Sequence, residues 1–191
     1  TLKVYYNLAL AHRIAVRTLK EQHGHLLFGA AHQCNHVVAT RKNNITDRLM
    51  VWIQKYYWNW WYLNRINRTQ DFVGINFYFT DYRKGYSLLP KNPSQPINDL
   101  GWYMDPAGIE HVINEAWRRY KKPILITENG VADRHDQYRA WWLDETFAAM
   151  QRSINKGAKL IGYLHWSLLD NFEWSSGWWP QFGLISVDRK T

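Results

Sequence analysis

The sequence has one cysteine, Cys34, among 191 residues, so no intrachain disulfide can form and a reducing compartment is favoured. It also lacks long hydrophobic runs: no stretch approaches the about 20 apolar residues of a membrane span. No signal peptide is visible, and the chain starts TLKVYY without Met, which leaves the native N-terminus open. We therefore expect a cytoplasmic protein that has no membrane partner.

Acidic residues are fewer than basic ones, with 16 Asp and Glu against 24 Lys and Arg, a formal charge of +8. Such an excess can attract nucleic acid or an anionic surface. No basic run is long, however. The densest group, Arg118, Arg119, Lys121 and Lys122, falls at the expected end of a helix, where cations complement the helix dipole. A solvated basic face explains the charge better, and we expect no nucleic-acid partner.

Aromatic residues are abundant, with 12 Trp and 12 Tyr. Indole and phenol rings suit the flat apolar faces of ligands such as sugars, but they also fill ordinary cores. The count alone leaves both interpretations open.

Apolar spacing and breaker residues predict helices and strands in strict alternation. Gly24 and Gly157 can end helices, and Asp136 and the Asp105–Pro106 pair can begin them. Residues 80–104 are polar and rich in breakers, which indicates an irregular loop. The expected helices cover 1–22, 46–66, 105–120 and 137–156, the expected strands 26–31, 72–79, 124–127 and 160–166, and a further extended piece lies near 182–188.

This alternation is typical of an α/β fold with parallel strands. It fits a doubly wound sheet or half of an eight-stranded (β/α)8 barrel. A complete barrel of this type usually needs about 250 residues. Four strands cannot close a barrel by themselves.

Polar side chains gather where the expected strands end. Glu128 ends the strand ILIT, Asn76 and Tyr78 lie late in the strand before it, and Trp166 lies late in the strand after it. In parallel α/β folds these ends meet at one edge, where catalytic groups collect. Glu128 alone could equally cap a helix or pair with an arginine. A carboxylate, an amide, a phenol and an indole together favour a site for sugar hydroxyls and C–H faces.

Three segments carry a family resemblance: ITENG at 126–130, DFVGINFY at 71–78 and HWSLLDNFEW at 165–174. GWYMDPAGI at 101–109 and GWWPQFGLISVD at 177–188 add to it. Together they resemble glycoside hydrolase family 1, the β-glucosidase family. The resemblance implies an α/β fold of the (β/α)8 TIM-barrel type, with residues 1–191 forming the C-terminal half of one domain, approximately strands five to eight.

The same resemblance implies roles for individual residues. Glu128 resembles the catalytic nucleophile of a retaining enzyme, and Asn76 and Tyr78 resemble the residues that orient the nucleophile and the sugar. Trp166, Glu173, Trp174 and Phe182 resemble substrate-binding residues, as stacking platform, hydroxyl ligands and aromatic wall. No cofactor is implied.

In the HWSLLDNFEW segment we expect Asp170 and Asn171 to shape the loop by hydrogen bonds rather than to contact substrate. Three positions depart from the family pattern. Phe77 and Trp178 stand where Tyr is more common, and Gln181 stands where Arg is usual. The loss of the arginine charge makes a specificity carried over from the family less secure.

A retaining glycosidase needs a second carboxyl group about 5 to 5.5 Å from the nucleophile. The family's acid/base lies in a Thr-x-Asn-Glu-Pro segment at the end of strand four, and no Asn-Glu-Pro occurs here. The resemblance therefore implies a retaining β-glycosidase acting on β-glucosides, completed by a partner half barrel: an upstream segment, a separate chain or a second copy. A non-catalytic sugar-binding module and a structural half-barrel fragment remain alternatives.

The segment HQCNH places His32, Cys34 and His36 at alternate positions, which on a strand share one face within possible zinc range. No fourth ligand is apparent. Polar residues lining the barrel mouth are the better interpretation, and we expect no metal.

Overall fold

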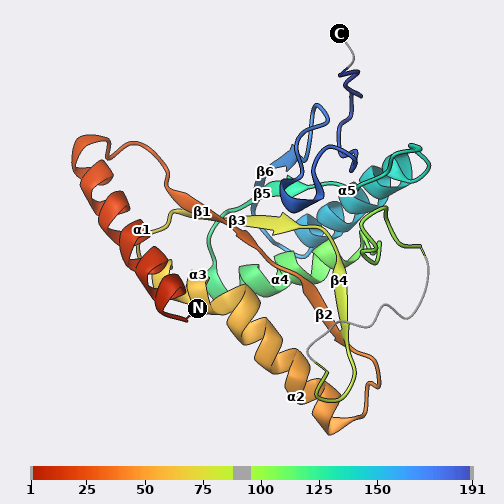
Figure 1. Ribbon diagram of the computed structural model, residues 1–191. Helices are drawn as coiled ribbons and strands as arrows, with labels where there is room; N and C mark the ends of the chain where they lie inside the picture. The colour runs from red at the N-terminus through yellow and green to blue at the C-terminus, as the bar shows by residue number, and fades with distance from the viewer. Residues whose placement is uncertain (1, 88–95, 190–191) are drawn as a thin grey trace.

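The computed structural model describes residues 2–87 and 96–189 (Figure 1). Helices and strands alternate along most of this chain, as the sequence predicts. In chain order the elements are α1 (Leu2–Gln22), β1 (Gly29–Gln33), β2 (His36–Ala39), α2 (Ile45–Gln54), the π-helical turn η1 (Lys55–Trp60), α3 (Trp61–Ile66), β3 (Phe72–Phe77), β4 (Thr80–Arg83), α4 (Gly108–Tyr120), β5 (Ile124–Asn129), α5 (Arg139–Asn155), β6 (Leu160–His165) and the 3-10 turn η2 (Trp174–Ser176).

The main sheet has four parallel strands in the order β1-β3-β5-β6. Neighbours in the sheet are joined through helices, so each connection is a crossover of the kind that parallel strands require. The sheet is open: among the described residues, β1 and β6 each have a strand neighbour on one side only.

The core lies between the central strands and the helices that cover them. Val73, Ile75 and Phe77 alternate along β3 and are fully buried, as are Ile124 and Ile126 of β5. They pack with apolar residues of α3, α4 and α5 in one cluster. Successive side chains of a strand point to opposite faces, so every second residue of β3 faces the covering helices.

A small second sheet corrects one expectation. β4 lies inside the segment 80–104 expected to be irregular, and it pairs in parallel with β2. Each strand has only four residues and is stabilised by a partner distant in sequence, which local patterns do not reveal. Residues 88–95 of the expected loop lie outside the described residues.

Several boundaries also differ from expectation. The first strand is Gly29–Gln33 rather than 26–31. Helix α4 begins at Gly108 rather than directly after Asp105, whose carboxylate accepts a hydrogen bond from Thr80 Oγ1 (2.7 Å). At the start of α5, Asp133 rather than Asp136 accepts the N–H groups, at 2.6 Å from Tyr138 and 3.1 Å from Arg139.

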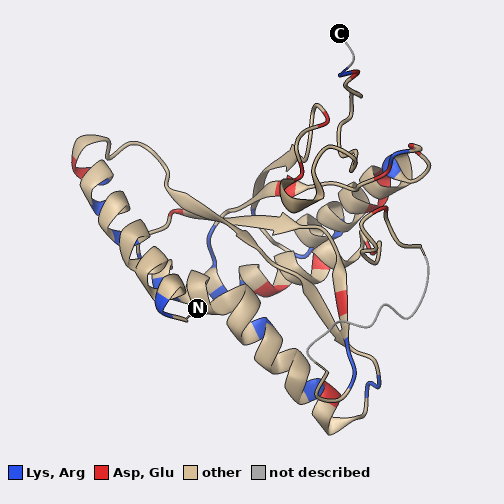
Figure 2. Ribbon diagram, in the orientation of Figure 1, with Lys and Arg blue, Asp and Glu red and all other residues tan. Residues whose placement is uncertain are grey.

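Basic residues are spread over several elements, including α1, α2 and α5, rather than gathered on one (Figure 2). None of the described helices is long and apolar enough to cross a membrane.

Candidate active site

Glu128 stands on an irregularity of β5. The register with β3 shifts between Ile75 and Asn76, so that Ile75 pairs with Ile126 but Asn76 pairs with Glu128. The register with β6 shifts in the same part of β5. Bulges of this kind re-aim side chains next to active sites. The sequence predicted that ILIT ends before Glu128, whereas the strand continues through Asn129.

Tyr78 is hydrogen-bonded to Glu128, its hydroxyl donating to Oε2 at 2.7 Å. Burial raises the pKa of Tyr78 above its ordinary value, and the hydrogen bond and negative charge of Glu128 raise it further. Tyr78 therefore stays protonated and serves as a donor to the carboxylate at any ordinary pH.

Asn76 lies beside Glu128 in the sheet, but its side chain bonds elsewhere. Its Oδ1 accepts a hydrogen bond from Thr127 Oγ1 at 2.6 Å. The amide is thus fixed against the residue that precedes Glu128 and steadies the bulged segment.

Trp166, Glu173 and Trp174 reach the same site from the end of β6 and the loop after it. They line a pocket of about 440 Å³ together with Glu128 and Tyr78. The peptide bond after Trp166 is cis. Trp174 is 81% exposed, so its ring stands at the open side of the pocket.

Glu173 is a second carboxylate in this pocket. Burial and the negative charge of Glu128 raise its pKa, while a hydrogen bond from Trp166 opposes the rise. Its Oε2 is buried without a hydrogen-bond partner among the described residues. A buried acceptor of this kind is satisfied by a ligand hydroxyl or by water.

Phe182 lies behind the pocket and does not line it. It is 1% exposed, and its ring centroid is 6.1 Å from that of Tyr78 and 6.3 Å from that of Trp102. It supports the aromatic wall from the rear, so any effect on substrate acts through these two rings.

Four pocket residues were missed by sequence reasoning: Gln33, Trp58, Phe79 and Trp102. Gln33 ends β1 and Phe79 follows β3, so the strand-end rule that found Glu128 could have found them. Trp102 belongs to the segment GWYMDPAGI, and it comes from the part of the chain expected to be a loop. Trp58 lies within an expected helix and gave no signal.

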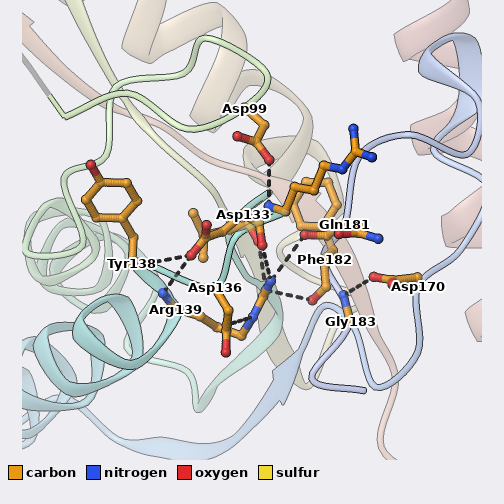
Figure 3. A network of polar contacts seen from close by, with 11 residues as sticks. Asp99, Asp133, Asp136, Tyr138, Arg139, Asp170, Gln181, Phe182 and Gly183 are labelled. Atoms are coloured by element: carbon orange, nitrogen blue, oxygen red, sulfur yellow. Dashed lines mark hydrogen bonds and ion pairs between the residues drawn. The ribbon is translucent and has the colours of Figure 1, made fainter. Parts of the chain in front are cut away.

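The loop after β5 is held by a buried arginine, Arg139 (Figure 3). Its Nε pairs with Asp136 at 2.8 Å. The sequence analysis did not single out Arg139. A cation in the first turn of a helix opposes the helix dipole, and this unfavourable position could have indicated a structural role. The terminal nitrogens of Arg139 donate to the backbone carbonyls of Val131, Asp133, Gln181 and Phe182 at 2.7 to 3.4 Å.

Gln181 takes part in this network through its backbone. Its carbonyl accepts from Arg139 and also from the N–H of Asp133 at 2.9 Å. Asp170 fixes the same segment, accepting from the N–H groups of Gly183 (2.9 Å) and Val187 (3.3 Å). Asn171 donates to Ser167 Oγ at 3.1 Å. The expectation that Asp170 and Asn171 shape the loop is confirmed.

His32, Cys34 and His36 take separate places. His32 Nε2 lies 2.8 Å from the carbonyl oxygen of Trp58, Cys34 is buried, and the His36 ring stacks on His111 at 4.2 Å. Across the described ranges, no group of three His, Cys, Asp or Glu side chains could hold a metal ion.

Comparison with known proteins defines the class. The model of glycosyl hydrolase family 1 matches residues 62–191, and the chain belongs to this family. It is 38% identical over 136 residues to a β-galactosidase of Sulfolobus acidocaldarius, covering 63% of this chain and 28% of that protein. It is 35% identical over 144 residues to β-glucosidase A of Thermotoga maritima, covering 68% of this chain and 32% of that protein.

The solved structure of the family 1 β-glucosidase from Thermotoga maritima matches with a TM-score of 0.87 at 25% identity, covering 96% of this chain and 51% of that chain. The fold is thus part of a (β/α)8 barrel, approximately strands five to eight, as the sequence predicts. The chain spans about a third or less of the curated relatives described above and about half of this solved structure.

Proposed function

We propose that the protein is a retaining β-glycosidase that hydrolyses β-glucosides, in which Glu128 is the nucleophile. The observation that carries this proposal is the carboxylate of Glu128, held at 2.7 Å by Tyr78, in a pocket with four indoles and a second carboxylate. Family membership supports the same reaction class.

In the first step, a Glu128 oxygen bonds to the anomeric carbon while the bond from that carbon to the leaving oxygen breaks. A carboxyl group from the complementary half barrel, outside this sequence, gives its proton to the leaving oxygen. In the second step that group takes a proton from water, whose oxygen displaces Glu128. Tyr78 holds Glu128 in position, and Trp166, Glu173 and Trp174 hold the sugar.

The test is covalent labelling of Glu128. The folded chain is incubated with 2,4-dinitrophenyl 2-deoxy-2-fluoro-β-glucoside, whose leaving group needs little help from an acid, and its intact mass is followed. We expect a glycosyl ester on Glu128, mapped by peptide analysis. Glu128→Gln should take no label, whereas Glu145→Gln, a change on the exposed side of α5, should label like the wild type.

If the folded wild-type protein takes no label, the proposal that Glu128 acts as a nucleophile in this chain by itself is contradicted. Titration with a β-glucoside would then separate the two alternatives. A sugar-binding module binds the glucoside and tolerates Glu128→Ala with little loss of affinity, whereas a structural half-barrel fragment binds none.

A further inference from the structure

A π-helical turn interrupts the helical run from Ile45 to Ile66 next to the candidate active site. The sequence predicted one regular helix here. The turn, Lys55–Trp60, has the wider spacing that is rare in proteins and frequent at functional sites. Trp58, at the fourth position of this turn, is the residue that enters the lining of the pocket.

The residues around Trp58 point elsewhere and hold the turn in place. Asn59 is buried and forms two hydrogen bonds with the backbone of Asn35, donating to its carbonyl at 2.8 Å and accepting from its N–H at 3.1 Å. Trp60 is buried and donates from Nε1 to Glu115 at 2.8 Å.

The carbonyl of Trp58 is itself fixed, because His32 Nε2 lies 2.8 Å from it. His32 belongs to β1, and Asn35 lies between β1 and β2, directly before His36. The chain at Trp58 and Asn59 is therefore hydrogen-bonded to β1 and to the short segment between β1 and β2. A ring on such a rigid support loses little entropy when a ligand stacks on it.

Trp58 approaches the pocket from the β1 side of the sheet, whereas Trp166, Glu173 and Trp174 approach from the β6 side. Glu128 lies between them, on β5. If the β6 side holds the sugar ring, the space on the β1 side is left for the leaving group. The leaving group departs from the face of the anomeric carbon opposite the nucleophile.

We infer that Trp58 is a specificity-determining residue, which forms a wall of the leaving-group subsite and selects glycosides with a flat aromatic leaving group. This inference rests on the proposed function and specifies its substrate class. The geometry that supports it is an indole on a clamped π-turn, across the pocket from the sugar-binding indoles.

The test compares two non-hydrolysable ligands that share one sugar: phenyl 1-thio-β-glucoside and methyl 1-thio-β-glucoside. Their dissociation constants are measured by calorimetry on the full chain. The wild type should bind the phenyl ligand more tightly. Trp58→Ala should reduce this preference by about three- to tenfold, the size expected for loss of one aromatic pair, and leave methyl-ligand binding unchanged.

Two variants serve as controls. Trp52→Ala removes an indole of the same helical run that is 63% exposed and lies outside the pocket lining, and it should leave the preference intact. Trp58→Phe keeps a smaller ring and should retain part of the preference. Circular dichroism establishes that each variant folds.

The outcomes separate the two proposals. If the wild type binds neither ligand, the proposed function fails and this inference fails with it. If it binds both without preference, or if Trp58→Ala weakens both equally or neither, the inference about Trp58 is wrong while sugar binding stands.

Labelling rates give a second measurement that uses the same variants. Trp58→Ala should slow labelling by the dinitrophenyl fluoroglucoside. It should not slow labelling by 2-deoxy-2-fluoro-glucosyl fluoride, whose leaving group is a single atom. Equal slowing with both reagents would contradict a leaving-group role.

Discussion

The central strands and the outer strands of the main sheet differ in how completely this chain buries them. Ile126 of β5 is fully buried, whereas Ile161 of β6 is 46% exposed. Both belong to parallel strands one place apart in the sheet. The difference shows that Glu128 stands on a strand that this chain covers by itself, whereas β6, at the edge of the described sheet, remains partly exposed.

The same contrast divides the pocket. Glu128 and Tyr78 stand on or directly after the central strands and are bonded to each other. Trp58 and Trp174 come from the two outer sides and remain substantially exposed. Exposed sheet edges and apolar faces favour association. We propose that a complementary half barrel covers them and supplies the acid/base group.

A matched pair of substitutions tests the contrast most strongly. Ile126→Ala should lower the free energy of unfolding by about 2 to 5 kcal/mol, because it leaves a cavity in the core. Ile161→Ala should cost less than about 1 kcal/mol, because the side chain is half exposed. Urea denaturation of the isolated chain measures both. Equal costs would mean that β6 is covered in solution, which sedimentation would reveal as self-association.

Tyr78→Phe removes the hydrogen bond to Glu128 and leaves the ring packed near Trp102 and Phe182. A hydrogen bond to a charged group is worth about 1.5 to 3 kcal/mol. We therefore expect labelling of Glu128 by the dinitrophenyl fluoroglucoside to slow by about 10- to 100-fold. Tyr86→Phe, a change at an exposed tyrosine, is the control. An unchanged rate would show that the hydrogen bond does not matter for attack.

Gly130→Ala tests the contact between the end of the central strand β5 and the end of the edge strand β6. A Cβ at Gly130 would lie 1.8 Å from the carbonyl oxygen of Trp166, so the end of β6 must move. Overpacking of this kind costs about 1 to 3 kcal/mol. We expect lower stability by urea denaturation and weaker glucoside binding by calorimetry. Gly24→Ala, whose nearest contact is 3.3 Å, should be milder; equal effects would exclude a special role for the contact between β5 and β6.

Glu173→Gln has the smallest expected effect on stability and a clear pH dependence. Because burial and Glu128 raise the pKa of Glu173, its ionisation disfavours the folded state, and this penalty is present above the folded-state pKa and vanishes as the pH falls through it. The variant should equal or slightly exceed wild-type stability at about pH 7 and match it at about pH 4.

The affinity for sugar should depend on pH in the opposite sense to stability. In the wild type it should weaken as the pH falls through the raised pKa of Glu173, because the protonated carboxyl is a poorer acceptor for hydroxyls. In Glu173→Gln it should be weaker throughout and lose this dependence. Calorimetric titration with methyl 1-thio-β-glucoside across this range measures it. A retained dependence would assign the titration to another group.

The sequence by itself determined the alternation of helices and strands, because apolar spacing and breakers act locally. It also placed Glu128, Tyr78 and Trp166 at strand ends, where parallel topology brings them together. The sequence motifs indicated membership of glycoside hydrolase family 1, and the match to the family model shows this membership.

Only the tertiary structure decided the rest. The pairing of β2 with β4, the bulge that sets Glu128 beside Asn76, and the π-turn that turns Trp58 to the pocket each depend on hydrogen bonds between residues distant in sequence. Local secondary-structure propensity contains no information about hydrogen bonds between residues that are distant in sequence. For the same reason the sequence could not show that Phe182 stands behind the pocket: its place is fixed by the loop that Arg139 and Asp170 hold against β5.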